Sequence, residues 1–291
     1  MKPTFKLTAL ASALSLTTLL VACGGGSSSG TGSSTAGIGG SGIISSGTIT
    51  GFGSVFVNGV KFETTNTSFD IEGTAGVQDD LAIGMVVKVN GTINPDGVTG
   101  TANSIVFDDD LQGPVANFAL AADGLTATFT VLGIQVKVDS KLTYFDDDNG
   151  GISITTIANG NTVELSGFFD ANGTLIASRI ENKTGSDDNV ELKGNITGLT
   201  GTTLILKGIS VDASHATLDD LPNGLQEGIY VEVEGTYDGT QIIAEKIESE
   251  AFEYGDSDEF EIEGFVTNFI SNGNFKVNGI TVDASRAEME P

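Results

Sequence analysis

Acidic side chains are the most numerous residues in this sequence that could take part in catalysis or bind a ligand. The chain has 39 Asp and Glu against 13 Lys and Arg, with one His and one Cys. Acidic residues cluster at 79–80, 108–110, 146–148, 187–188 and 219–220, and between 250 and 261. Two carboxylates across a cleft can cleave a glycosidic bond, and loops rich in acids can supply the roughly six to eight oxygen ligands of Ca²⁺.

The spacing of these acids favours neither glycoside cleavage nor calcium binding. Consecutive Asp residues on an extended chain point in opposite directions, and no EF-hand or Gly-Gly-x-Gly-x-Asp spacing occurs. We therefore expect solvated linker acids, with a calcium-stabilised or small-ligand-binding module as the alternative. A glycosidase-like enzyme is the third interpretation, because a chain with no Trp and 4 Tyr offers little surface for stacking sugars.

His215 is the only histidine, and it stands alone. Its surroundings, Ala-Ser-His-Ala at 213–216, recur as Ala-Ser-Arg-Ala at 284–287, so the position accepts Arg. Catalytic triads and common zinc sites need further His or Cys groups. We therefore predict no catalytic residue, no metal ligand and no cofactor, and expect the chain not to be an enzyme.

The single cysteine, Cys23, ends an apolar N-terminal segment. Lys2 and Lys6 precede a run without charge from 7 to 22, which is the layout of a signal peptide. At about 16 residues this run is shorter than the roughly 20 that a spanning helix needs. The sequence Leu-Val-Ala-Cys at 20–23 resembles the bacterial lipobox, in which the cysteine is acylated. We predict a signal peptide at 1–22.

Cys23 is thus the predicted lipidation site, and a lone Cys in an exported chain has no disulfide partner to explain it otherwise. Gly24 is not the Asp that signals inner-membrane retention in such lipoproteins. We therefore expect a lipid anchor in the outer membrane, with the side of that membrane left open. Residues 23–46 are nearly all Gly, Ser and Thr, which predicts a flexible tether.

The net charge of −26 restricts the possible partners. Nucleic-acid binding needs basic grooves with stacking aromatics, so we expect none. A partner should be calcium or another cation, and any protein partner is unidentified. Alternatively, the charge only keeps a β-rich protein soluble.

A repeated pattern divides the rest of the sequence into units. Glycine pairs bracket an alternating segment at 84–91, 160–167 and 228–235, and Ala-x-x-Ile follows each pair. The units open with Gly-x-Ile or Gly-x-Val at 47–49, 113–115, 194–196 and 264–266. The sequence therefore contains three complete repeats and part of a fourth.

Period-two alternation indicates strands in every unit. Met85, Val87 and Val89 share one face of such a strand, and polar residues lie between them. Asn-Gly at 58–59 and 278–279 predicts two-residue hairpin turns, whereas Leu-Gly at 132–133 and Lys-Gly at 207–208 fit that turn less well. Ala102 and Ile105 are three residues apart, so either a β-bulge intervenes or the Ala faces outward.

About five short strands in roughly 70 residues can close into a small antiparallel barrel of the OB type. We therefore predict an all-β protein of tandem OB-like barrels, three complete and one partial, behind the disordered tether. The predicted domains are 47–112, 113–187 and 188–250 for repeats 1 to 3, and 251–291 for an acidic linker with partial repeat 4.

Four segments resemble the bacterial domain of unknown function 5666, which occurs as tandem copies in exported proteins. They are Val-Asn-Gly-Val at 57–60, the segment 80–91, Leu-Gln-Gly-Pro-Val at 111–115 and Val-Glu-Val-Glu-Gly at 231–235. The resemblance covers the chain from about Ser46 onward and implies architecture without catalytic residues.

The fourth repeat stops before its Gly-bracketed strand, which would leave Phe265, Phe269 and Phe275 unpaired. We expect either a fragment of a longer chain or a last hairpin that adds onto the third domain. Taken together, the sequence predicts a membrane-anchored cell-envelope lipoprotein that acts as a non-catalytic structural or interaction module.

Overall fold

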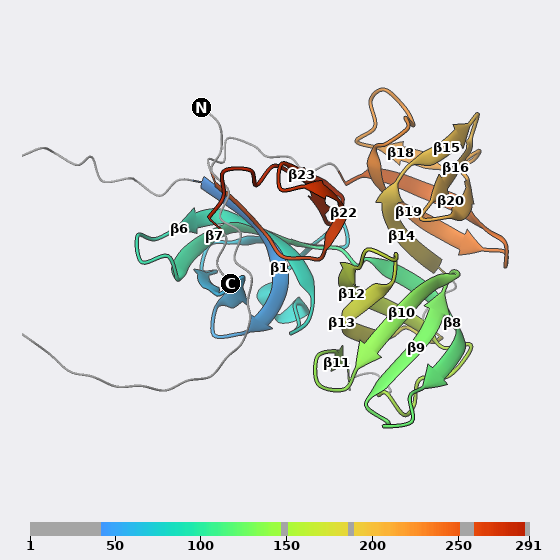
Figure 1. The fold of residues 1–291 in the computed structure, drawn as a ribbon, viewed down its shortest axis with the longest axis horizontal. Helices are drawn as coiled ribbons and strands as arrows, with labels where there is room; N and C mark the ends of the chain where they lie inside the picture. The colour runs from blue at the N-terminus through green and yellow to red at the C-terminus, as the bar shows by residue number, and fades with distance from the viewer. Residues whose placement is uncertain (1–41, 147–150, 186–188, 251–258, 289–291) are drawn as a thin grey trace, which may run out of the picture.

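The computed structural model describes residues 42–146, 151–185, 189–250 and 259–288 (Figure 1). This part of the chain is all-β, with 24 strands in three sheets and a single 3₁₀ turn, η1 (Gln78–Asp80). Within it, no helix has the length and apolarity to cross a membrane. Cys23 and most of the predicted tether lie outside the described residues.

The first repeat forms a closed five-stranded barrel, barrel 1 (residues 42–107). Its strands are β1 (Gly42–Gly51), β2 (Val55–Val57), β3 (Val60–Glu63), β6 (Val86–Ile93) and β7 (Thr99–Phe107). The pairing runs β1–β2–β3–β7–β6 and returns to β1, with every pair antiparallel except the parallel β3–β7 pair. This closure confirms the OB-like barrel. Phe62, Ile105 and Phe107 fill its interior.

The second and third repeats close in the same order. Barrel 2 (residues 111–182) uses β8 (Leu111–Leu120), β9 (Thr126–Val131), β10 (Ile134–Asp139), β12 (Thr162–Phe169) and β13 (Leu175–Asn182). Barrel 3 (residues 189–249) uses β14 (Asn189–Asn195) with β15 (Thr197–Thr200), β16 (Thr203–Leu206), β17 (Ile209–Asp212), β19 (Tyr230–Tyr237) and β20 (Gln241–Ser249). The three-barrel prediction is therefore correct.

Short strands occupy the variable stretch between the third and fourth barrel strands. They are β4 (Ser68–Ile71) and β5 (Thr74–Gly76) in barrel 1, β11 (Tyr144–Phe145) in barrel 2 and β18 (Thr217–Asp219) in barrel 3. Three of these, β4, β11 and β18, add in parallel to the last strand of their barrel.

The recurring glycine pairs have two distinct structural roles. Gly84, the first of its pair, has φ +92° and donates its N–H to the carbonyl of Ile49, the last residue of the Gly-x-Ile opening. Gly91, the second, sits at a β-bulge where a Cβ would lie 2.2 Å from the carbonyl oxygen of Thr101. The bulge turns both Ala102 and Ile105 inward, so the first of the two sequence alternatives is correct.

The four hairpin turns share one backbone conformation. Asn58, Leu132, Lys207 and Asn278 all have φ between +46° and +52°, and a glycine of positive φ follows each. Leu132 and Lys207, which were expected to fit this turn less well than Asn, adopt it all the same. Each of these side chains lies over the glycine that opens its repeat, and this contact accepts an apolar or aliphatic stem as well as an amide.

The first strand begins earlier than the sequence suggested. β1 starts at Gly42, so the prediction of a flexible linker reaching residue 46 is wrong for 42–46. Ile43 and Ile44 are buried there, and the segment pairs with β6 on one side and β21 (Glu259–Ile262) on the other. Apolar burial and two strand neighbours order a segment that its Gly and Ser content alone would leave flexible.

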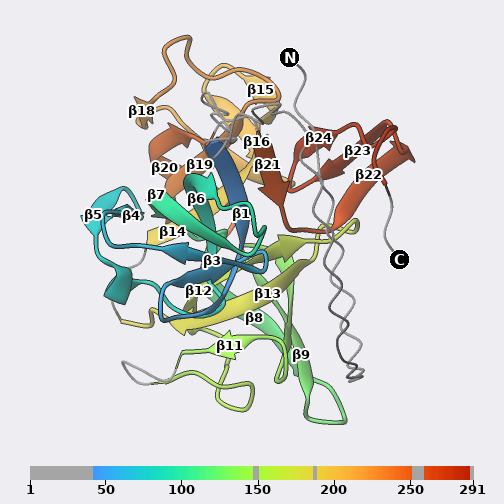
Figure 2. The ribbon, with the colours of Figure 1, turned by 90° about the vertical axis from the view of Figure 1, so that its left-hand side faces the viewer.

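The fourth repeat returns to the first barrel rather than to the third. β21 pairs in parallel with β1, side by side with it in Figure 2, and β22 (Val266–Ser271), β23 (Asn274–Val277) and β24 (Ile280–Val282) form a separate three-stranded sheet. In that sheet Phe275 is buried while Phe265 and Phe269 are exposed. The rings of Phe269 and Phe275 lie 6.1 Å apart, so the expectation of unpaired apolar side chains is wrong for this pair, and Phe265 remains exposed.

The barrels contact one another through specific backbone groups. β8 of barrel 2 pairs with β14 of barrel 3 at Gln112 and Glu191, and this joins the two barrels into one 13-stranded sheet. Ser178 of barrel 2 donates its hydroxyl to the carbonyl of Gly84 in barrel 1, at 2.6 Å. Figure 1 shows the resulting group, with barrels 2 and 3 stacked beside barrel 1 and the fourth repeat.

Candidate functional site

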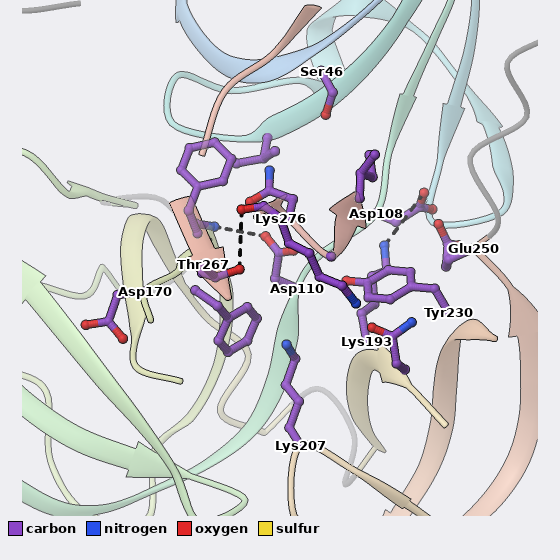
Figure 3. Close-up of a pocket in the computed structure, with 18 of the residues that line it drawn as sticks. Ser46, Asp108, Asp110, Asp170, Lys193, Lys207, Tyr230, Glu250, Thr267 and Lys276 are labelled. Carbon is purple, nitrogen blue, oxygen red and sulfur yellow. Dashed lines mark hydrogen bonds and ion pairs between the residues drawn. The ribbon is translucent and has the colours of Figure 1, made fainter. Parts of the chain in front are cut away.

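A cavity of about 580 Å³ lies where all four repeats meet, and we call it the central cavity (Figure 3). Its charged and aromatic lining comprises Lys88 of barrel 1, Asp108 and Asp110 of the linker between barrels 1 and 2, Phe168, Phe169 and Asp170 of barrel 2, Lys193, Lys207 and Tyr230 of barrel 3, Glu250 just after it, and Lys276 of the fourth repeat. The volume falls within the range of roughly 300–1,000 Å³ found for small-molecule sites.

The three acidic side chains of the linker between barrels 1 and 2 point in two different directions. Asp108 and Asp110 line the central cavity, whereas Asp109 between them is buried elsewhere. Asp110 accepts a hydrogen bond from the backbone N–H of Gly167 at 2.9 Å. Burial raises the pKa of Asp110 to about 6, because removal from water disfavours the carboxylate. The solvated-linker interpretation is therefore wrong for this acidic run.

Lys193 on β14 is a buried cation surrounded by acids. Its ammonium lies 3.7 Å from Glu232 and 3.8 Å from Asp108. Burial lowers the pKa of Lys193, but the negative charges of Glu232, Glu250, Asp108 and Asp110 outweigh this effect and hold the pKa above its ordinary value. The lysine is therefore charged, and it links the Asp108 linker to barrel 3.

Lys207, at the β16–β17 turn, points into the same cavity from below in Figure 3. Its ammonium lies 3.4 Å from the centre of the Phe169 ring on β12. Loss of hydration around the ammonium lowers the pKa of Lys207 to about 8, partly offset by the charge of Asp110. Among the described residues, neither Lys207 nor Lys276 across the cavity has an ion-pair partner.

A second, smaller cavity of about 270 Å³ lies between barrel 1 and barrel 3, and we call it the acidic cavity. Eight carboxylates and two lysines line it: Asp70, Glu72, Asp108, Glu191, Glu232, Glu234, Glu248 and Glu250, with Lys88 and Lys246. Lys246 pairs with Glu234 at 3.0 Å and with Glu248 at 2.6 Å. The surfaces of barrels 1 and 3 thus meet with like charge.

The other residues considered from the sequence lie away from both cavities. His215, the pair 79–80 and the pair 219–220 are exposed. Asp146 pairs with Arg179 at 2.5 Å within barrel 2. Residues 147–148, 187–188 and 251–258 lie outside the described residues, as does the predicted lipidation site Cys23.

Sequence reasoning missed the residues that assemble the two cavities. Strand alternation correctly places Glu232 and Glu234 on the outer face of barrel 3, opposite buried Val231 and Val233. It gave no sign that a neighbouring barrel covers that face. Charged residues clustered on the outer face of a β-strand are the one sequence signal that could have identified the acidic cavity.

Comparison with protein families gives three matches that coincide with barrels 1, 2 and 3. The model of the domain of unknown function DUF5666 matches residues 41–106, 112–181 and 193–248. The chain belongs to the DUF5666 family. Each DUF5666 match covers one closed barrel. The resemblance seen in the sequence is thereby confirmed at the level of the family and its tandem repeats.

Two further comparisons add little to the DUF5666 assignment. No curated protein matches the chain. A solved structure titled "drosophila Unr CSD456" is similar at 12% sequence identity and a TM-score of 0.21, over 69% of this chain and 85% of that chain. The barrel topology of the DUF5666 repeats rests on their own strand pairings.

Proposed function

We propose that this chain is a lipid-anchored, non-catalytic interaction module of the cell envelope. In this proposal Cys23 carries the lipid, residues after it tether the barrels, and the repeats together present one binding cavity. The observation that carries the binding part is the convergence of side chains from all four repeats on the central cavity. A string of independent barrels would build no shared site.

The chemistry of the central cavity favours a small ligand with an anionic group. The chain as a whole carries a net charge of −26, yet four lysines line this cavity beside its four carboxylates, Asp108, Asp110, Asp170 and Glu250. Lys207 and Lys276 have no ion-pair partner in the described part of the chain, so both can bind an anion. Phe168 and Phe169 add an apolar wall, which is typical of small-molecule sites.

Lipid attachment is tested directly on Cys23. Cells producing the chain are grown with an alkyne-labelled fatty acid, and labelling and membrane fractionation are compared with those of the Cys23→Ala variant. The proposal predicts labelled, membrane-bound wild-type protein and an unlabelled variant that is released from the membrane. An unlabelled wild-type protein would contradict it.

Ligand binding is tested with anilinonaphthalene sulfonate, a fluorescent probe that combines a sulfonate with aromatic rings. Titration of the wild type is compared with Lys207→Gln and with Lys137→Gln, whose side chain is exposed on β10. The proposal predicts a loss of probe affinity of about tenfold for Lys207→Gln, since a charge-assisted contact contributes roughly 1.5 kcal/mol or more. Equal affinity in both variants would place the probe outside this cavity.

A further inference from the structure

Three carboxylates from separate segments meet where barrels 1, 2 and 3 adjoin. Asp109 belongs to the linker between barrels 1 and 2, Glu191 to β14 and Glu232 to β19. Their oxygen atoms all lie within 4.8 Å of one another. β14 and β19 are antiparallel neighbours, with Glu191 opposite Glu234 and Lys193 opposite Glu232. Glu191 and Glu232 therefore project from one outer face of barrel 3, toward Asp109.

Asp109 distinguishes this group from an ordinary surface cluster. It is only 1% exposed, and among the described residues neither of its carboxylate oxygens has a hydrogen-bond partner. A carboxylate removed from water is strongly destabilised unless a cation or hydrogen-bond donors compensate for the loss of hydration. The neighbours Asp108 and Asp110 have such partners, in Lys193 and the Gly167 N–H.

The groups around Asp109 are mostly other carboxylates, so they add negative charge and do not compensate for its own. Burial, followed by the nearby carboxylates of Glu191, Glu164 and Glu232, raises the pKa of Asp109 well above its ordinary value. Lys193 contacts Glu232 and Asp108. In the part of the chain that the structure describes, no ion pair involves Asp109 or Glu191.

A second carboxylate trio nearby provides the contrast. Glu232, Glu234 and Glu248 also have oxygens within 4.8 Å of one another. Lys246 supplies a positive charge there, at 3.0 Å from Glu234 and 2.6 Å from Glu248. In the Asp109 trio Lys193 reaches only Glu232, at 3.7 Å, and no ion pair among the described residues involves Asp109 or Glu191.

We propose that Asp109, Glu191 and Glu232 bind Ca²⁺ and that this ion joins the linker between barrels 1 and 2 to barrel 3. Calcium takes oxygen ligands in flexible geometry, whereas Mg²⁺ demands a near-ideal octahedron and retains much of its water. Three carboxylates supply up to about six oxygens, and water completes the shell. Glu191 and Glu232 also line the acidic cavity, which gives the ion a path from solvent.

The bound ion has a structural consequence for the whole assembly. The acidic cavity brings eight carboxylates and two lysines together between barrels 1 and 3, and like charges at short range repel. Lys246 offsets this repulsion at Glu234 and Glu248. Calcium would offset it at the Asp109 trio. The ion therefore stabilises the arrangement of barrels that forms the central cavity.

The test uses the full-length chain, purified in detergent and freed of metal with a chelator. Calorimetric titration with CaCl₂ and with MgCl₂ at matched ionic strength measures affinity, and differential scanning calorimetry measures the melting temperature. The variants are Asp109→Asn and Glu191→Gln, with Asp79→Asn as the matched control, because Asp79 is exposed and outside both cavities. Glu248→Gln probes the second trio.

One calcium ion should bind with a dissociation constant of about 10⁻⁴–10⁻³ M, as in extracellular modules, and should raise the melting temperature. Asp109→Asn and Glu191→Gln should each weaken this binding by about tenfold or more, the lower end expected for loss of a charged ligand, while Asp79→Asn leaves it unchanged. Without metal, Asp109→Asn should melt at a higher temperature than the wild type, because it removes a carboxyl group that must either stay ionised away from water or take up a proton on folding.

Several outcomes would overturn the proposal. The wild type could give neither heat nor a melting shift at millimolar calcium, which would indicate that the carboxylates share protons instead. Equal shifts with Mg²⁺ or Na⁺ at matched ionic strength would indicate screening. Loss of binding in Glu248→Gln but not in Asp109→Asn would place the ion at the second trio. If Asp109→Asn fails to fold, Glu191→Gln decides the same question.

Discussion

The ammonium of Lys207 lies 3.4 Å from the centre of the Phe169 ring. Lys207 belongs to the β16–β17 turn of barrel 3 and Phe169 to the end of β12 in barrel 2, so this contact crosses between two repeats. Lys207 occupies the same position of the hairpin turn as Asn58 in the first repeat and Asn278 in the fourth. The same turn therefore serves the fold in every repeat, and in the third and fourth repeats it also lines the central cavity, with Lys207 and Asn278.

A double-mutant cycle measures this contact. Cation–π pairs contribute about 0.5–1 kcal/mol at exposed sites and about 2 kcal/mol when desolvated. We expect Lys207→Met and Phe169→Leu to show a coupling energy of about 0.5–1 kcal/mol in melting experiments. Lys137→Met, on the exposed side of β10, is the control and should show no coupling with Phe169→Leu. Additive effects of Lys207→Met and Phe169→Leu would show that the pair does not stabilise the barrel contact.

The bulge glycines should tolerate no side chain. A Cβ on Gly235 would lie 2.1 Å from the carbonyl oxygen of Ile243 and 2.9 Å from the Cα of Ala244, and both are backbone atoms of the paired strand. We expect Gly235→Ala to destabilise barrel 3 by about 3 kcal/mol or more, as backbone displacement in a buried sheet does. Scanning calorimetry of the full chain measures the loss.

Gly239→Ala is the matched control for this substitution. Gly239 has φ +98°, and a Cβ there would meet no atom within 4 Å. Its replacement should cost only the backbone strain of positive φ, about 1–2 kcal/mol. If the two variants are equally stable, the close approach at the bulge is not what requires glycine in the repeat.

The repeats made most of the fold predictable. Alternation identified the strands, the glycine pairs marked strand four, and the spacing of Ala102 and Ile105 gave a bulge as one of two alternatives. The Asn-Gly turns fixed two of the four first hairpins. Sequence reasoning was wrong where tertiary contacts dominate: Ile43 and Ile44 order a Gly/Ser-rich segment because β6 and β21 lie on either side of it.

The site was less predictable than the fold, for a physical reason. Within one barrel, period two separates inner from outer side chains, but it does not show which outer faces another barrel covers. Strand alternation makes Glu232 a solvent-facing residue, Asp109 belongs to an acidic run, and the sequence does not single out Glu191. Only the packing of barrel against barrel brings the three together and removes Asp109 from water.

Glu164 should make stability depend on pH. Its side chain is 4% exposed and lies 2.5 Å from Lys183. Burial, with the charge of Glu72, raises its pKa from the ordinary value of 4.5 to about 8. An acid that holds its proton more tightly in the folded state stabilises the fold at low pH. This contribution is lost as pH rises from about 4.5 to about 8.

Glu164→Gln removes that titration and nearly preserves the shape. In chelator, we expect the melting temperature of the wild type to fall more between about pH 5 and pH 8 than that of the variant. Glu245→Gln, at an exposed position of β20, should follow the wild type. Parallel pH profiles of wild type and Glu164→Gln would mean that Glu164 is ionised throughout this range.

Asn58 ties the first hairpin to the strand that opens barrel 1. Its side-chain amide donates to the carbonyl of Ser46 at 3.1 Å and to the hydroxyl of Ser45 at 3.0 Å, across Gly47. The backbone of Asn58 has φ +51°, a conformation that Asn adopts more readily than Ala. Asn58→Ala therefore loses both the hydrogen bonds and the turn preference.

The expected cost of Asn58→Ala is about 2 kcal/mol, since a hydrogen bond contributes about 1 kcal/mol and left-handed backbone costs Ala a similar amount. Asn103→Ala, exposed on β7, is the control and should stay within about 0.5 kcal/mol of the wild type. Asn58→Gly separates the two causes, because it relieves the backbone and still lacks the amide. If Asn58→Gly is as stable as the wild type, the amide contacts with Ser45 and Ser46 contribute nothing, and turn geometry alone explains the Asn.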